Sequence, residues 1–159
     1  MAKKVLHETK LKTGHYKTAA VVVWCFDDRY TPALKKIAED RGWEHFDLVK
    51  LAGGANTLLW ANESVIEFIM WNITAGIDLH DAPHVMLMMH VECGACKAEH
   101  QETGLEWHDY IEPKLVKIQS LLRAHLDKNN YQHVTIELVL SDFDKTYQFE
   151  PEETQVAVH

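Results

Sequence analysis

Residues 18–26 read TAAVVVWCF, a near-continuous apolar run that is rich in β-branched side chains. Such a run is typical of a strand that is buried on both faces of a parallel sheet. Three further segments with strand character lie at residues 45–51, 84–91 and 134–140. The sequence therefore predicts a sheet of about four strands.

Segments with helical periodicity separate these strands. They span residues 31–41, 58–79 and 107–128, where apolar side chains recur at three- and four-residue steps. Pro113 lies inside the last segment, so we expect that helix to begin near Ile111 or to be kinked before it. Strands that alternate with helices predict an α/β fold with an open, mostly parallel sheet flanked by helices.

The length of 159 residues predicts one domain, with a short N-terminal arm at about 1–17 and an acidic C-terminal tail at about 141–159. A net charge of −8 argues against nucleic acid or an anionic membrane as the main partner. The first 17 residues lack the apolar core of a secretory signal, and the three cysteines are an odd number. We therefore expect a cytoplasmic protein with free thiols.

Metal-ligating side chains stand where the first and third strands end. Residues 25–29 read Cys-Phe-Asp-Asp-Arg, and residues 90–94 read His-Val-Glu-Cys-Gly. The two clusters converge if these strands are neighbours, because ligands bind beyond the carboxyl ends of parallel strands where strand order reverses. Cys25, His90 and Cys93 form a soft and borderline ligand set that suits Zn²⁺.

Asp27 and Arg29 follow Cys25 at two-residue steps, so in an extended chain all three side chains can face one pocket. Three protein ligands leave one tetrahedral position, which Asp27, water or each in turn could occupy. Arg29 can hold the Asp27 carboxylate in a bidentate pair and draw it off the metal. Zinc then lowers the pKa of a water at the open position toward about 7, which yields a zinc-bound hydroxide at neutral pH.

Cys-x-Asp-x-Arg at one strand end and His-x-x-Cys-Gly at a later one resemble the motifs of the β-class carbonic anhydrases. The resemblance implies that Cys25, His90 and Cys93 bind zinc, with Asp27 as a conditional fourth ligand and with Asp27 and Arg29 as a gating pair. The implied activity is reversible hydration of carbon dioxide to bicarbonate. The resemblance also implies homodimers or multiples of dimers, with active sites near the subunit interface.

Gly53 and Gly54 follow the second strand, within Lys-Leu-Ala-Gly-Gly at residues 50–54, where that family usually has Arg-Asn-Ala-Gly. The glycines suit a tight turn, and backbone N–H groups exposed there can hold an anion, so we assign both to the substrate pocket. Because the loop lacks the polar pair, a zinc hydrolase of carbonyl sulfide or carbon disulfide is an alternative function.

Two other hypotheses stay open. In a non-catalytic zinc protein, Asp27 would remain bound to the metal and close the site. In a thiol redox protein, the Cys-x-x-Cys sequence at residues 93–96 would be the reactive pair, as in thioredoxin-like sites. The redox hypothesis accounts for Cys96 but leaves four residues without a role, namely Cys25, Asp27, Arg29 and His90. We therefore favour the carbonic anhydrase interpretation.

Overall fold

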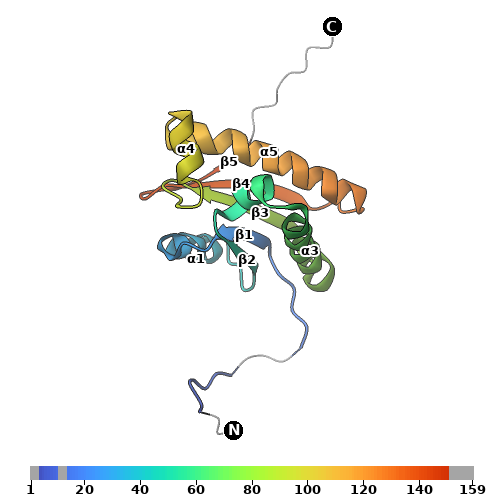
Figure 1. Ribbon diagram of the computed structural model, residues 1–159. Helices are drawn as coiled ribbons and strands as arrows, with labels where there is room; N and C mark the ends of the chain where they lie inside the picture. The colour runs from blue at the N-terminus through green and yellow to red at the C-terminus, as the bar shows by residue number, and fades with distance from the viewer. Residues whose placement is uncertain (1–3, 11–13, 151–159) are drawn as a thin grey trace.

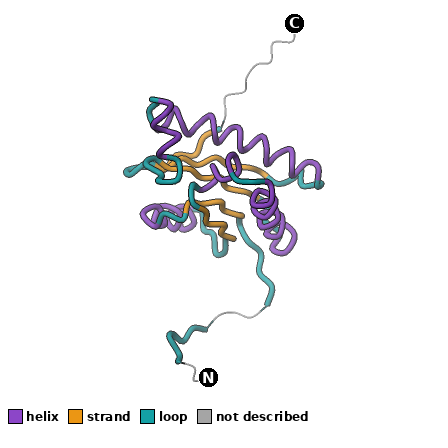
Figure 2. Tube along the Cα trace, in the orientation of Figure 1, coloured by secondary structure: helices purple, strands orange, loops and turns teal. Residues whose placement is uncertain are grey.

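The computed structural model describes residues 4–10 and 14–150, which form an open five-stranded sheet with helices on both sides (Figures 1 and 2). The strands are β1 (Val21–Cys25), β2 (Asp47–Leu51), β3 (His84–His90), β4 (Thr135–Ser141) and β5 (Thr146–Phe149). Their order is β2-β1-β3-β4-β5; the first four are parallel and β5 is antiparallel to β4. The predicted α/β class is confirmed, and strand order reverses between β1 and β3.

The helices are α1 (Thr31–Asp40), α2 (Thr57–Trp60), α3 (Glu63–His80), α4 (Lys97–Thr103) and α5 (Trp107–Lys128), with short 3-10 turns η1 (Asp28–Tyr30) and η2 (Gly54–Asn56). Figure 1 shows α1 and α3 on opposite sides of β1 and β2, and α5 running along the part of the sheet that holds β3 and β4. No helix in the described ranges is both long and apolar enough to cross a bilayer.

The core lies between the central strands and the two long helices. Every residue of β1 is buried, as the apolar run predicts, and so are the last six residues of β3. The fully buried apolar side chains from the helices are Ile69 and Ile73 of α3 and Ile111, Leu115, Ile118, Leu122 and Leu126 of α5. At Gly76 a Cβ would lie 2.4 Å from Val21 Cγ2, so glycine permits the close approach of α3 to β1. This packing holds the ends of β1 and β3 in fixed positions.

The prediction of an irregular acidic tail from residue 141 is wrong for its described part. Ser141 ends β4, and residues 146–149 form β5 as an edge strand on β4. The Asp142 carboxylate accepts from the backbone N–H groups of Asp144 and Lys145 and so stabilises the turn between the strands. A short, half-exposed edge strand lacks the apolar run that would identify it in the sequence. Residues 151–159 lie outside the described residues.

Two predicted helix boundaries are also wrong. Residues 58–79 do not form one helix, because Asn62 has extended backbone angles and its side chain caps α3 by accepting from the N–H of Val65. The last long helix spans Trp107–Lys128, the whole predicted segment, so the expected start near Ile111 is wrong, and Pro113 lies inside the helix. Its first turns are anchored by Tyr110, which is buried and whose N–H donates to the Glu106 carbonyl.

Candidate metal centre

The structure brings together the three predicted ligands Cys25, His90 and Cys93. Cys25 ends β1, His90 ends β3, and Cys93 lies in the turn that follows β3. Because β1 and β3 are neighbours in the sheet, the ligand atoms of all three residues lie within 4.8 Å of one another. Their exposed fractions are 1%, 1% and 3%. We expected the two clusters to converge if the first and third strands were neighbours. They are neighbours, and the clusters do converge.

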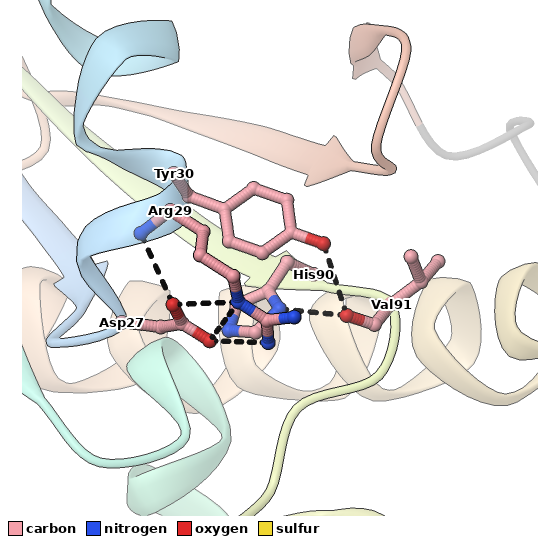
Figure 3. A network of polar contacts seen from close by, with 5 residues as sticks. All are labelled: Asp27, Arg29, Tyr30, His90 and Val91. Carbon is pink, nitrogen blue, oxygen red and sulfur yellow. Dashed lines mark hydrogen bonds and ion pairs between the residues drawn. The ribbon is translucent and has the colours of Figure 1, made fainter.

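The His90 ring is oriented so that one nitrogen is free to bind a metal. Its Nδ1 lies 2.8 Å from the Val91 carbonyl oxygen, which can only accept, so Nδ1 carries the proton and donates (Figure 3). Its Nε2 is buried and has no hydrogen-bond partner among the described residues. A buried nitrogen lone pair without a partner is costly in an apoprotein and suits a metal ligand.

The thiols also fit a cation. A hydrogen bond with Cys93 and burial together raise the pKa of the Cys25 thiol to about 12, so without a nearby cation Cys25 stays protonated at neutral pH. A bound divalent ion reverses this preference, because it stabilises the thiolate directly. Two sulfurs and one imidazole nitrogen are a donor set that Zn²⁺ accepts in tetrahedral sites. Cys25, His90 and Cys93 therefore fit a Zn²⁺ ion.

Asp27 and Arg29 form the predicted bidentate pair on η1 (Figure 3). Arg29 Nε donates to Asp27 Oδ1 at 3.0 Å, and an Arg29 terminal nitrogen donates to Asp27 Oδ2 at 2.6 Å. The backbone N–H of Arg29 donates to Oδ1 as well, at 3.1 Å. These contacts hold the pKa of the Asp27 carboxyl below its ordinary value. Both carboxylate oxygens are engaged by Arg29, and Asp27 is not among the ligands that converge within 4.8 Å.

A cavity of about 440 Å³ lies beside Arg29, between α1 and the turn that connects β4 to β5. Its lining includes Arg29, Tyr30 and Phe143. The Arg29 guanidinium carbon lies 5.6 Å from the centre of the Phe143 ring, within the range of a cation–π contact. A small molecule in this cavity therefore meets the guanidinium that holds Asp27.

Comparison with known proteins bears on the fold. No protein-family model and no curated protein matches the sequence. A carbonic anhydrase from Streptococcus mutans has a similar structure at 17% identity, with 91% of this chain and 89% of that chain covered and a TM-score of 0.56. The β-carbonic anhydrase isoform I of Trichomonas vaginalis is similar at 15% identity, with 89% and 87% covered and a TM-score of 0.52. The chain has the β-carbonic anhydrase fold.

A third structure with the β-carbonic anhydrase fold comes from Sordaria macrospora and is described as one of two tetrameric β-carbonic anhydrases. It is 12% identical, with 86% of this chain and 82% of that chain covered and a TM-score of 0.52. The three structures span nearly the whole of this chain. They confirm the fold that the resemblance implied. At 12–17% sequence identity, this similarity establishes the fold and nothing further.

In this β-carbonic anhydrase fold, Gly53 and Gly54 form the turn after β2. Both have left-handed φ values, of 88° and 58°. A Cβ at Gly54 would lie 2.5 Å from the Met88 carbonyl oxygen and 3.3 Å from the Cys25 nitrogen. Gly54 therefore packs against the backbone of β1 and β3 behind the metal ligands, and this contact accounts for the glycine. A role of either glycine in a substrate pocket stays a prediction.

Two residues around the ligand cluster are not apparent from the sequence. The ring of Tyr30 lies 4.1 Å from the ring of His90, and its hydroxyl donates to the Val91 carbonyl oxygen at 3.1 Å. Asn56 is buried, and its Nδ2 donates to Cys96 Sγ at 3.4 Å. Tyr30 directly follows the motif that ends at Arg29. No local pattern indicates that it contacts His90 and Val91, which lie about 60 residues further along the chain.

Proposed function

We propose that the chain binds one Zn²⁺ through Cys25, His90 and Cys93 and catalyses the reversible hydration of carbon dioxide to bicarbonate. The observation that carries this proposal is the buried ligand cluster with its unpartnered His90 Nε2, beside the Asp27–Arg29 pair. Support comes from the fold, which this chain shares with carbonic anhydrases of Streptococcus mutans and Trichomonas vaginalis.

Zinc in this site would supply a nucleophile near neutral pH by acidifying a water molecule. Around it, Val91 and Tyr30 hold the His90 ring, so that Nε2 keeps its lone pair toward the ligand cluster. The Asp27 carboxylate is ionised and can accept a hydrogen bond from the reacting water. Arg29 restrains Asp27 by donating hydrogen bonds to both of its carboxylate oxygens. The reaction consumes carbon dioxide and water and releases bicarbonate and a proton to solvent.

The Arg29 contacts favour a catalytic site over a closed one. In the closed alternative, Asp27 would bind the metal permanently as its fourth ligand. Here both oxygens of Asp27 accept from Arg29. A zinc ion held by Cys25, His90 and Cys93 would then keep a fourth position for water. We therefore propose that Asp27 is a conditional ligand that Arg29 normally holds away.

We further propose a homo-oligomer in a reducing compartment such as the cytoplasm. All three cysteines lie among the described residues, and all are free thiols. Free thiols of this kind are typical of reducing compartments. The Sordaria macrospora proteins with this fold are described as tetrameric, which supports association of this chain with copies of itself.

Stopped-flow measurement of carbon dioxide hydration, from about pH 6.5 to about 9, tests the function. Zinc content is determined on the same sample. We expect hydration that rises with pH in the zinc-loaded chain and that is lost in Cys93→Ser, which removes one ligand. Cys96→Ser is the matched control, because it makes the same substitution three residues away at a thiol that is not a ligand.

Full zinc occupancy without hydration at any pH would refute the proposal. In that case carbonyl sulfide and carbon disulfide become the next substrates to assay. Equal loss of hydration in Cys96→Ser and Cys93→Ser would also contradict the assignment of ligands, provided that both variants keep the circular dichroism spectrum of the parent.

A further inference from the structure

Cys96 is a buried thiol that the proposed metal site does not use. Its exposed fraction is 1%, and its sulfur accepts a hydrogen bond from Asn56 Nδ2 at 3.4 Å. Cys93 belongs to the ligand cluster with Cys25, and a backbone hydrogen bond places it in the same turn as Cys96. A metal ligand in contact with a spare thiol can lose its role by forming a bond to that thiol.

We propose that Cys93 and Cys96 are a modification site at which a peroxide forms a reversible disulfide. This disulfide withdraws Cys93 from the ligand cluster, so that oxidation regulates the metal site. The inference rests on the proposed function only in taking Cys93 as a zinc ligand. It does not depend on which substrate the site acts on.

The turn that holds both cysteines suits a cross-link. The N–H of Cys96 donates to the Cys93 carbonyl at 3.0 Å, which closes a four-residue turn and brings the two residues together. A Cβ on the intervening Gly94 would meet no atom within 4 Å, so this part of the turn has room to adjust. The turn can therefore form the disulfide with small backbone movement.

Cys25 is less suited to the same reaction, although its thiol also contacts Cys93. It ends β1, which pairs with β2 along its whole length and also with β3. A bond between Cys25 and Cys93 would have to form without distorting that paired strand, because disulfide geometry is narrow. The Cys93–Cys96 link is therefore the one that this structure favours.

Peroxide can reach the pair through local opening of α4. This helix begins directly after Cys96, has seven residues and buries none of them. Segments with few buried side chains open at low free-energy cost compared with the core strands. The ligand cluster itself is held by β1 and β3, so the opening exposes Cys96 before it exposes Cys25.

The chemistry balances with hydrogen peroxide as the oxidant. The Cys96 thiolate attacks one peroxide oxygen; an S–O bond forms, the O–O bond breaks, and the leaving oxygen takes up a proton to become water. The Cys93 thiolate then attacks the Cys96 sulfur; the S–S bond forms, the S–O bond breaks, and a second water leaves. Two thiols are oxidised and one peroxide is reduced to two waters.

The test treats the zinc-loaded full chain with hydrogen peroxide and follows two readouts. A chromophoric chelator measures zinc release, and mass spectrometry of alkylated peptides maps the disulfide. We expect a link between Cys93 and Cys96, release of zinc in step with it, and reversal by dithiothreitol. In Cys96→Ser, zinc release should slow by roughly tenfold or more, because the fast disulfide route is absent.

Cys96→Ala serves as a second variant, and circular dichroism shows whether each variant keeps the fold. Zinc release from both folded variants at the rate of the parent would overturn the proposal, and so would a mapped link between Cys25 and Cys93. The test is independent of catalysis. A chain that forms the Cys93–Cys96 link with peroxide but hydrates no carbon dioxide before that treatment refutes only the proposed function. A chain that hydrates carbon dioxide but keeps Cys96 as a thiol after peroxide treatment refutes only this inference.

Discussion

The guanidinium of Arg29 determines where the Asp27 carboxylate points. It contacts both carboxylate oxygens, although its own side chain is 54% exposed and that of Asp27 is 21% exposed. An exposed ion pair contributes little to the stability of a fold. The geometry of this pair therefore matters for the metal site more than for the free energy of unfolding.

Arg29→Ala should free Asp27 to approach the metal. We expect hydration activity to fall by about 10- to 100-fold, as is typical when an outer partner of a metal site is lost, while zinc content stays full. The assay is stopped-flow hydration with zinc determined on the same sample. Lys35→Ala, which removes an exposed cation from neighbouring α1, is the control. An unchanged rate in Arg29→Ala would remove Arg29 from the mechanism.

The pH dependence of activity should not come from Asp27. Arg29 lowers the pKa of this carboxyl from its ordinary value of 3.8, so Asp27 is ionised throughout the range of the hydration assay. A carboxyl with a lowered pKa in the folded state stabilises the fold above its ordinary pKa and ceases to do so as the pH falls through the lowered value. A rise in hydration near neutral pH would therefore report deprotonation of the reacting water.

Tyr30 positions His90 in two ways, through ring contact and through the shared Val91 carbonyl. Tyr30→Phe keeps the ring and loses the hydroxyl, so we expect about 1 kcal/mol less stability and a fall in zinc affinity of up to about tenfold. Tyr30→Ala loses both, and its zinc affinity should fall further. A competition titration with a chelator measures the affinities, and chemical denaturation measures stability.

Tyr147→Phe is the matched control, because it removes a tyrosine hydroxyl that donates to Asp142 instead. The positioning role would be ruled out if the Phe and Ala variants of Tyr30 both bound zinc as tightly as the parent chain.

The short helix α4 is attached to α5 by polar contacts and by the His100 ring, which stacks on the Trp107 ring with centroids 3.7 Å apart. None of its residues is buried. Its Glu99 accepts from the Tyr110 hydroxyl at 2.8 Å and from the Lys114 ammonium, and Lys114 is the main cause of a lowered Glu99 pKa. Ionised Glu99 therefore provides part of the attachment of α4 to α5.

Glu99→Gln should therefore destabilise the chain at neutral pH and have little effect in acid. Because the folded-state pKa is lowered, the stabilisation by Glu99 is present above its ordinary value of 4.5 and is lost as the pH falls through the lowered value. We expect a difference of no more than about 1 kcal/mol at pH ~7, since the Glu99 side chain is 52% exposed. Urea denaturation at about pH 7 and about pH 3 measures it, and an equal difference at both values would contradict the ionic origin.

The whole chain leaves large aromatic side chains uncovered on α3. Phe68 and Trp71 are 59% and 63% exposed, and their rings stack with centroids 6.1 Å apart. Trp60, which ends α2, is also exposed, at 57%. Grouped aromatic exposure of this kind is typical of surfaces that associate with other proteins.

We therefore expect the purified chain to form homodimers or multiples of dimers. Size-exclusion chromatography with light scattering should give a mass that is an even multiple of the 18.3 kDa of one chain. A single-chain mass at every concentration tested would contradict this prediction. The metal-stripped chain should be measured alongside, to show whether association depends on the metal.

Patterns within short stretches of the sequence were enough to predict much of this protein. The buried runs predicted β1 and β3, the three-and-four spacing predicted most of α3 and α5, and the two motifs predicted the residues that the structure brings together as a ligand cluster. A strand that is buried on both faces gives a continuous apolar run, and a helix that is buried on one side gives apolar residues at three- and four-residue steps. Both patterns can be read from consecutive residues. The edge strand β5 and the break before Asn62 depend on pairing and capping, and they were missed.

Only the tertiary structure decided which side chains surround the cluster. The contact of Tyr30 with Val91 joins residues 61 positions apart, and that of Asn56 with Cys96 joins residues 40 positions apart. Both contacts depend on β1 and β3 being neighbours, with η2 packed against them. Strand order is set by how all helices and strands pack at once, and no local pattern of residues encodes it.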